Sequence, residues 1–113
     1  MTPAAAIAML DRQLSRHGQT ITLRRGPKGA ATATLTVKGF VTGFKADEIV
    51  PGSGISQNDD KVIVSPSSLT GWPGASPGAD DWCEINGKFR AVVIGRVRKL
   101  NDVIVRIELQ VKG

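Results

Sequence analysis

Few residues of this 113-residue chain could perform acid–base or nucleophilic chemistry, since it has one histidine, His17, and one cysteine, Cys83. Catalysis of either kind needs a positioned base beside a donor or a nucleophile. His17 lies among basic residues at an expected helix end, where a capping or exposed role is ordinary. Cys83 lies beside Trp82 and near Ile85 in an expected strand, which favours a small buried side chain over a reactive thiol. We therefore expect that this protein is not an enzyme.

Two pairs of neighbouring carboxylates, Asp59-Asp60 and Asp80-Asp81, are the remaining candidates for a metal site. Neighbouring residues of an extended chain point in opposite directions, so neither pair chelates a metal by itself. Because aspartate is favoured in turns, we interpret both pairs as solvated turn residues. The 13 glycines are scattered among turns and form no phosphate-binding signature between a strand and a helix. The sequence predicts no metal, no cofactor and no catalytic residue.

Length and composition are those of one ordinary globular domain. With 41% hydrophobic and 22% charged residues, the chain has neither a disordered nor a membranous composition. The apolar run from Pro3 to Leu10 is far shorter than the roughly 20 residues of a spanning helix, and it lacks the flanks of a secretory signal. A single cysteine allows no disulfide within the chain, which fits a reducing compartment. We expect one domain, residues 1–113, of cytoplasmic origin and with no membrane partner.

Charge is segregated along the chain into three parts. Residues 1–46 carry seven basic side chains and one acidic, residues 47–84 carry one and seven, and residues 85–113 carry seven and two. The net charges are therefore +6, −6 and +5, which add to the +5 of the whole chain. Complementary patches of this kind fix register and suppress wrong partners. The sequence predicts that the acidic middle pairs with basic ends, either its own or those of a neighbouring subunit.

A short helix is expected over residues 2–17. Thr2 is a suitable N-cap, Pro3 fits the first turn, and Gly18 supplies the stop. Apolar residues recur at spacings of three and four, namely Ile7, Leu10 and Leu14. Their stripe is narrow and rich in alanine, so we expect this helix to dock on another surface instead of forming part of the core.

The hydrophobic period changes to two over residues 19–112, which is typical of strands. Six or so short strands are expected, together with long loops at residues 45–60 and 66–81. Gly39 and Gly43 indicate bends where a sheet curls into a barrel. The fold class is therefore mainly β, a small antiparallel β-barrel or sandwich with one short N-terminal helix.

Two tight turns organise the C-terminal part. Asn86-Gly87 is the strongest hairpin signal in the chain, because a two-residue turn needs positive φ, and a second tight turn is expected near Leu100 to Asp102. The final strand alternates, with one set of apolar residues facing the same way: Val103, Val105, Ile107, Leu109 and Val111. Ile104 breaks this alternation, and we interpret it as a contact residue.

Basic residues cluster in the last hairpin and could neutralise phosphates: Arg90, Arg96, Arg98, Lys99 and Arg106. Small barrels that bind single strands place stacking aromatic residues on the same surface, whereas this chain has three phenylalanines, two tryptophans and no tyrosine. A nucleic-acid-binding module is therefore an alternative, and solvated strand faces or subunit contacts are at least as good an interpretation of these arginines.

The order of features resembles the small neck proteins of long-tailed bacteriophages, known as head–tail joining, head-completion or stopper proteins. Short stretches spread over nearly the whole chain carry this resemblance: Leu14–Gly18, Ile21–Arg25, the acidic loop, Asp60–Pro66 and the Asn86-Gly87 hairpin. The resemblance implies a structural virion protein, assembled in the host cytoplasm as a ring of about 6 or 12 copies in the head–tail connector. Its partners would be the portal, the adaptor, tail proteins and packaged DNA, which passes through without sequence-specific binding. A tail-completion or tail-terminator protein of the same neck is a further alternative.

Two groups of residues are then expected to carry this role. We expect the loop of residues 45–60 to face the DNA channel through its acidic and apolar side chains: Asp47, Glu48, Ile49, Val50, Ile55, Asp59 and Asp60. We expect subunit contacts from the helix stripe and from complementary charges: Ile7, Leu10, Leu14, Asp80, Asp81, Arg96, Arg98 and Arg106. The alternative for residues 45–60 is a solvent-exposed loop on the outer wall, or a loop that pairs with an adjacent ring.

Overall fold

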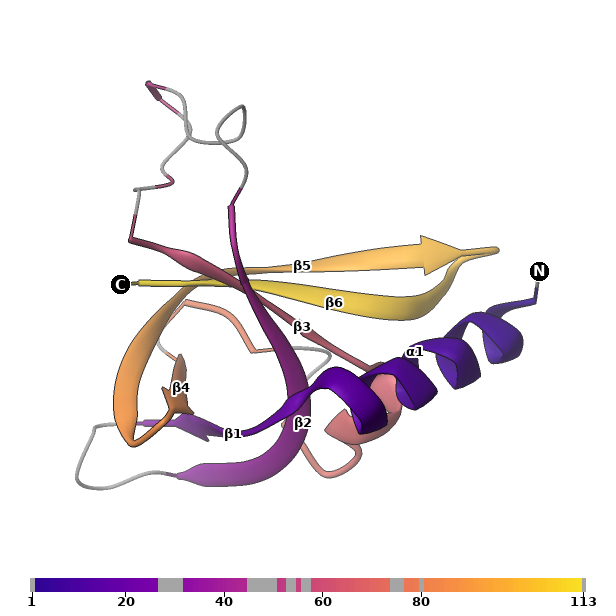
Figure 1. The fold of residues 1–113 in the computed structure, drawn as a ribbon, viewed down its shortest axis with the longest axis horizontal. Coiled ribbons are helices and arrows are strands. Elements are labelled where there is room, and N and C mark those ends of the chain that lie inside the picture. The colour runs from indigo at the N-terminus through magenta and orange to yellow at the C-terminus, as the bar shows by residue number, and fades with distance from the viewer. Residues whose placement is uncertain are drawn as a thin grey trace.

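The strands of this protein close into a barrel, as the computed structural model shows for residues 2–26, 32–44, 51–52, 55, 58–73, 77–79 and 81–112. In chain order the elements of these residues are helix α1 (Pro3–His17), β1 (Gln19–Arg25), β2 (Ala33–Gly43), β3 (Asp60–Val64), the 3₁₀ helix η1 (Pro66–Leu69), β4 (Asp81–Ile85), β5 (Lys88–Leu100) and β6 (Val103–Val111). The strands are antiparallel in the order β1-β2-β3-β6-β5-β4, and β4 returns to β1 (Figure 1). The predicted mainly β fold with one N-terminal helix is confirmed.

Helix α1 begins where the sequence predicts. The Thr2 hydroxyl accepts a hydrogen bond from the backbone N–H of Ala5 at 3.1 Å, and Pro3 occupies the first helical position. The helix ends at His17, but Gly18 has a φ of −78° and so is not the left-handed cap that a glycine stop usually provides. Glycine is required there for another reason, because a Cβ atom would lie 2.5 Å from the carbonyl oxygen of Leu14.

Strand β2 bends and thereby joins two halves of the barrel. Residues Ala33 to Gly39 pair with β1, and residues Phe40 to Gly43 pair with β3. At the changeover, a Cβ on Gly39 would lie 2.8 Å from Ile21 Cδ1. The missing side chain lets the strand turn tightly over the core, as the bend predicted at this glycine requires.

Both predicted hairpins have two-residue turns. Asn86 and Gly87 have φ values of 52° and 80°, and Asn101 and Asp102 have values of 50° and 64°. Positive φ at both central residues matches the right-handed twist of the flanking strands. The second turn contains no glycine, and asparagine and aspartate tolerate this conformation better than other side chains.

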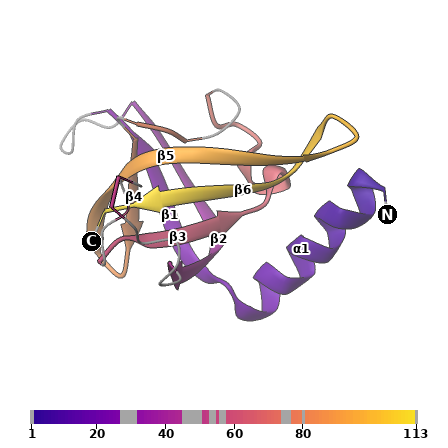
Figure 2. The same ribbon diagram turned by 90° about the horizontal axis from the view of Figure 1, so that it is seen from above.

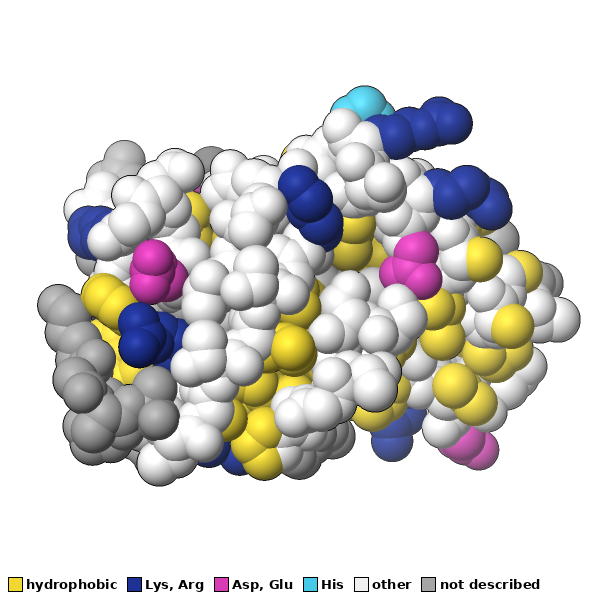
Figure 3. Space-filling model, turned by 90° about the horizontal axis from the view of Figure 1, so that it is seen from below, with side chains coloured by type: hydrophobic (Ala, Val, Ile, Leu, Met, Phe, Trp, Pro, Cys, Tyr) yellow, Lys and Arg dark blue, Asp and Glu magenta, His cyan; other side chains and the backbone are white. Residues whose placement is uncertain are grey.

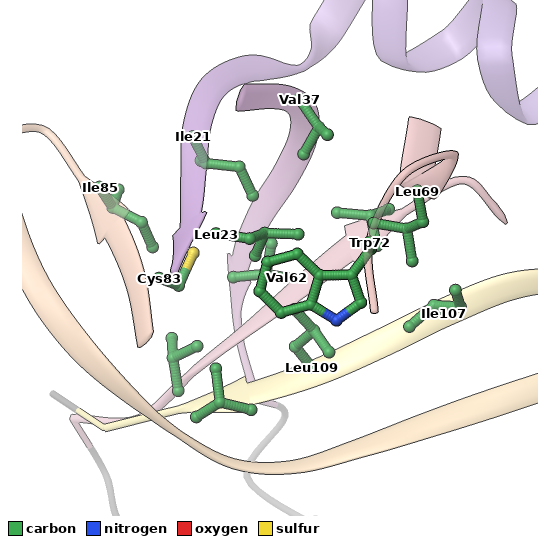
Figure 4. Packing of buried hydrophobic residues seen from close by; sticks show 13 residues of the cluster. Ile21, Leu23, Val37, Val62, Leu69, Trp72, Cys83, Ile85, Ile107 and Leu109 are labelled. Atoms are coloured by element: carbon green, nitrogen blue, oxygen red, sulfur yellow. The ribbon is translucent and has the colours of Figure 1, made fainter. Parts of the chain in front are cut away.

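The barrel encloses a core to which every strand contributes at least one side chain: Ile21, Leu23, Val37, Val62, Val64, Leu69, Trp72, Cys83, Ile85, Val92, Ile107, Leu109 and Val111. Two of these come from the stretch between β3 and β4 that the sequence indicated only as an irregular loop. Leu69 belongs to η1, and Trp72 points into the cluster just after it (Figure 4). That stretch is therefore part of the packed interior.

One assignment in β6 was wrong. Ile104 packs against the core, whereas Val103 is 46% exposed. Arg98 pairs with Arg106 while Lys99 pairs with Ile104, so Val105 is an extra residue in the ladder. A β-bulge of this kind reverses the side-chain alternation on one side of the bulge relative to the other. In the residues that precede Val105, Ile104 therefore faces inward and Val103 outward.

Candidate interaction surface

The two residues best suited to nucleophilic or acid–base chemistry lie in ordinary structural positions. Cys83 is completely buried. Burial raises the pKa of its thiol to about 12, and the positive charge of Arg90 lowers it only in part. His17 is exposed at the end of α1. Cys83 is therefore a core side chain, as its sequence context predicted.

The interpretation of the aspartate pairs as solvated turn residues is wrong for Asp59 and Asp81. Asp59 is 3% exposed and accepts a hydrogen bond of 2.9 Å from the buried side chain of Gln110. Asp81 is 2% exposed and lies at the start of β4. Buried carboxylates persist only when they are paired, and the sequence gives no sign of the partners because these are far away along the chain.

Asp81 is held by residues from two segments, β1 and the stretch just before β4. Arg25 donates to both carboxylate oxygens, from Nε at 2.8 Å and from Nη2 at 3.1 Å, and the backbone N–H of Gly78 donates at 2.8 Å. The same guanidinium donates to the Pro73 carbonyl and lies 5.2 Å from the ring centre of Trp72. The hydrogen bond to Asp81 raises the pKa of Arg25. Asp81 is thus occupied inside its own chain, which removes it from the expected subunit contacts.

The segregated charges pair within one chain, and several pairs join the acidic middle to a basic end. Besides Arg25 and Asp81, Arg24 lies 3.5 Å from Glu84, and Arg90 lies 2.7 Å from Asp60. Arg90 also donates to the carbonyls of Asn58 and Lys112, so it is not free to bind phosphate. The sequence left open whether the acidic middle pairs with the chain's own basic ends or with those of a neighbouring subunit. These contacts are made with the chain's own ends.

The expected channel loop lies largely outside the described residues, which exclude Asp47, Glu48, Ile49 and Val50. Of its three described members, Asp59 is buried and Asp60 pairs with Arg90. Ile55 is half-buried and lines a hollow on the outside of β5 and β6. Asp59 and Asp60 therefore do not present free negative charge, contrary to the expectation for that loop.

Two elements project from the barrel on the same side. Helix α1 and the far end of the β5–β6 hairpin both extend beyond the other strands (Figures 1 and 2). Leu14 is buried against the barrel, while Ile7 and Leu10 are half-buried. We call α1 and the hairpin segment from Ile94 to Arg106 the two arms.

A groove of about 400 Å³ separates α1 from the barrel wall. Its apolar lining comes from both sides: Leu10 and Leu14 from the helix, and Phe40 and Ile63 from β2 and β3. His17 and Arg106 add polar atoms. Phe40 is 42% exposed, and the sequence signal for this was its position opposite the inward-facing residues of its strand.

Hydrophobic side chains gather over the arms on the face shown in Figure 3. Large apolar residues are exposed on each arm, with Met9 at 39% on α1 and Val97 and Val103 at 37% and 46% on the hairpin. Apolar side chains that gather on one face mark an interaction site more often than isolated exposed residues do. Of the expected subunit contacts, Ile7, Leu10 and the hairpin arginines lie on the arms, while Asp80 is outside the described residues.

On the outer face of the hairpin two arginines share one carboxylate, and a third arginine is the cross-strand neighbour of that residue. Arg96 is the cross-strand partner of Glu108, and Arg98 is the partner of Arg106. Glu108 lies 3.1 Å from Arg106 and 3.6 Å from Arg98. With three arginines and one glutamate, this face retains an excess of positive charge. The pairing of Arg98 with Arg106 is destabilising, because like charges lie directly opposite each other.

In the part of the chain that the structure describes, no three histidine, cysteine or acidic side chains come together as a metal site. The same residues contain no helix long and apolar enough to cross a membrane. Comparisons with protein-family models, with curated proteins and with solved structures found no match to this chain.

Proposed function

We propose that this chain is a structural subunit of a tailed-bacteriophage virion, which assembles as a ring in the neck, closes the DNA-filled head and provides the surface for tail attachment. The observation that carries the proposal is the pair of arms, whose apolar side chains are exposed beside a barrel with a complete core of its own. A protein that functioned alone would gain stability by covering those side chains. Subunit assembly covers Met9 on α1 and Val103 on the hairpin instead.

The arrangement suits a ring because the two arms are different surfaces of one subunit. A head-to-tail contact between unlike surfaces generates a closed ring when the rotation between neighbours closes. The arms leave the barrel on one side, so they can reach a neighbour without rearranging the core (Figure 2). The resemblance to head-closure proteins in the sequence agrees with this role.

Mass measurement and electron microscopy of the purified protein test the assembly. We expect a species of several subunits with ring-shaped particles, and loss of that species when Met9 and Val103 are both replaced by glutamate. Replacing the exposed Thr34 of β2 by glutamate is the matched control, which should leave assembly intact. A protein that stays monomeric at all concentrations, or rings that persist in the double variant, would contradict the proposal.

Nucleic-acid binding is the second candidate, and the three arginines around Glu108 favour it. Neutralising phosphates releases counterions, so binding through these arginines would weaken steeply as salt increases. A gel shift with duplex and single-stranded DNA over a salt series separates the two functions. A connector subunit should show weak binding as a monomer, whereas tight, salt-dependent binding that is lost in Arg96→Gln/Arg98→Gln would favour the nucleic-acid module.

A further inference from the structure

In the part of the chain that the structure describes, the outermost strand of the projecting hairpin has an unpaired edge. β4 pairs with β5 only from Lys88 to Ala91, and β6 is the only strand among the described residues that pairs with β5 from Val92 to Leu100. The closure of the barrel therefore covers the first part of β5 and leaves nine residues with one neighbouring strand among the described residues (Figure 1). At about 3.3 Å per residue, this edge is about 25–30 Å long.

Side chains along the edge are accessible. Ile94 and Val97 are 42% and 37% exposed, and Arg96, Arg98 and Lys99 are exposed as well. A long edge with exposed apolar side chains is a template for another strand. Edge strands are usually protected from pairing with other chains because they are short or carry charged residues. The charged residues on this edge are all basic.

The charges on β5 exclude one kind of partner. If a second copy of β5 paired antiparallel over the same nine residues, Arg96 would lie directly opposite Arg96 of the copy, with Arg98 two positions away on the same face, and like charges across strands are destabilising. An acidic strand would instead be attracted. The edge is therefore selective for chains that carry carboxylates.

The alternation of β5 defines the partner more closely. Arg96 and Arg98 lie on the outer face with their partners Glu108 and Arg106, while Val97 lies on the face of its partner Ile107. We propose that the β5 edge binds an extended segment of a partner protein in which acidic residues alternate with apolar ones. Main-chain hydrogen bonds supply affinity, and alternate side chains supply specificity. The proposal goes beyond ring formation and does not depend on it.

Binding of synthetic peptides tests this site on the full chain. The probe is a capped nine-residue peptide that alternates glutamate with valine or threonine, and the control replaces each glutamate by lysine. We expect binding of the acidic peptide alone, with backbone amide shifts confined to β5 from Val92 to Leu100 in NMR spectra. The variant Arg96→Gln/Arg98→Gln should weaken binding by about tenfold or more, which corresponds to about 1.4 kcal/mol.

Peptides with N-methyl groups separate strand addition from simple charge attraction. An N-methylated residue cannot donate a main-chain hydrogen bond, and alternate residues of a strand direct their N–H groups to opposite edges. Methylation of one alternate set should therefore abolish binding while methylation of the other set leaves it intact. Equal binding by both methylated peptides, or no binding of the acidic peptide to the folded protein, would overturn the proposal.

Discussion

The barrel wall at β1 and β4 and the projecting hairpin arm both contain arginines that pair with a carboxylate, but the arginines differ in how fully they are paired. In the barrel wall, Arg25 donates to a carboxylate that is 2% exposed and stacks near Trp72. On the hairpin arm, Arg98 is exposed, faces Arg106 and shares one glutamate with it. The arginines of the barrel thus complete the fold, whereas those of the arm retain unused charge. The two regions differ in the arginines: Arg25 is 37% exposed and has Asp81 as its own partner, whereas Arg98 and Arg106 are 64% and 43% exposed and share one glutamate.

The largest difference should appear when apolar side chains of the two regions are shortened. Leu109 is completely buried and Leu10 is half-buried on α1. We expect Leu109→Ala to lower the free energy of unfolding by about 3–4 kcal/mol, because it leaves a cavity, and Leu10→Ala by less than about 1 kcal/mol. Urea denaturation followed by circular dichroism measures both. Equal losses would show that α1 is part of the core instead of an arm.

The ion pairs should differ next most. Asp81→Ala leaves the hydrogen-bond donors of Arg25 and Gly78 without their acceptor. Since the Arg25 side chain is 37% exposed and can turn to water, we expect a loss of about 2–3 kcal/mol, less than for a fully buried pair. The matched control is Glu84→Gln, which removes the more exposed pair with Arg24 and should cost about 0.5 kcal/mol or less. A loss for Asp81→Ala no larger than for this control would remove the distinction drawn between buried and exposed carboxylates.

Alkaline pH tests how the buried Cys83 thiol contributes to the stability of the barrel. Its pKa is raised from 9.0 to about 12, so the folded protein favours the neutral thiol. The stability that this contributes is complete below the unfolded value and is lost as the pH rises toward the folded value. Between about pH 8 and pH 10 we expect the free energy of unfolding of the native protein to fall by about 1 kcal/mol more than that of Cys83→Ala. Parallel pH profiles for the two proteins would show that the thiol does not carry this dependence.

Charge removal on the arm should have the smallest effect on stability. Arg98→Ala relieves the repulsion from Arg106 and loses an exposed contact with Glu108, so we expect a change within about 0.5 kcal/mol in either direction. Thermal denaturation at low and moderate salt measures it, with Arg25→Ala as the contrasting variant. A loss from Arg98→Ala as large as that from Arg25→Ala would mean that the arm's arginines are structural after all.

Much of the fold could be predicted because its signals are local. The N-cap at Thr2, the alternation through Ile21 and Leu23 and the Asn86-Gly87 turn each depend on a few neighbouring residues. Ile104 was misassigned because a bulge changes the side-chain alternation without leaving a mark in the hydrophobic pattern. Trp72 was missed as a core residue because its burial depends on the closing of the barrel around it.

The interaction surface was less accessible to sequence reasoning. The charge of the last hairpin was visible, and so was the helix stripe of Ile7, Leu10 and Leu14, but their place on two arms depends on topology. The partner of Asp81 lies 56 residues away, so nothing near that aspartate distinguishes it from a turn residue. Long-range pairing thus decides which charges the fold consumes and which remain for a partner.

The order of strands around the barrel also sets the timing of folding during synthesis. β3 can pair with β2 as soon as both are made, but its other neighbour, β6, is synthesised last. β1 likewise pairs early with β2, and its second neighbour, β4, is made much later. Contacts between such distant segments require loop closure before they stabilise anything. A nascent chain that has emerged only through β3 therefore exposes Val62 and Val64 to solvent and to chaperones. On the ribosome, the native state becomes available only when Val103–Val111 has left the exit tunnel.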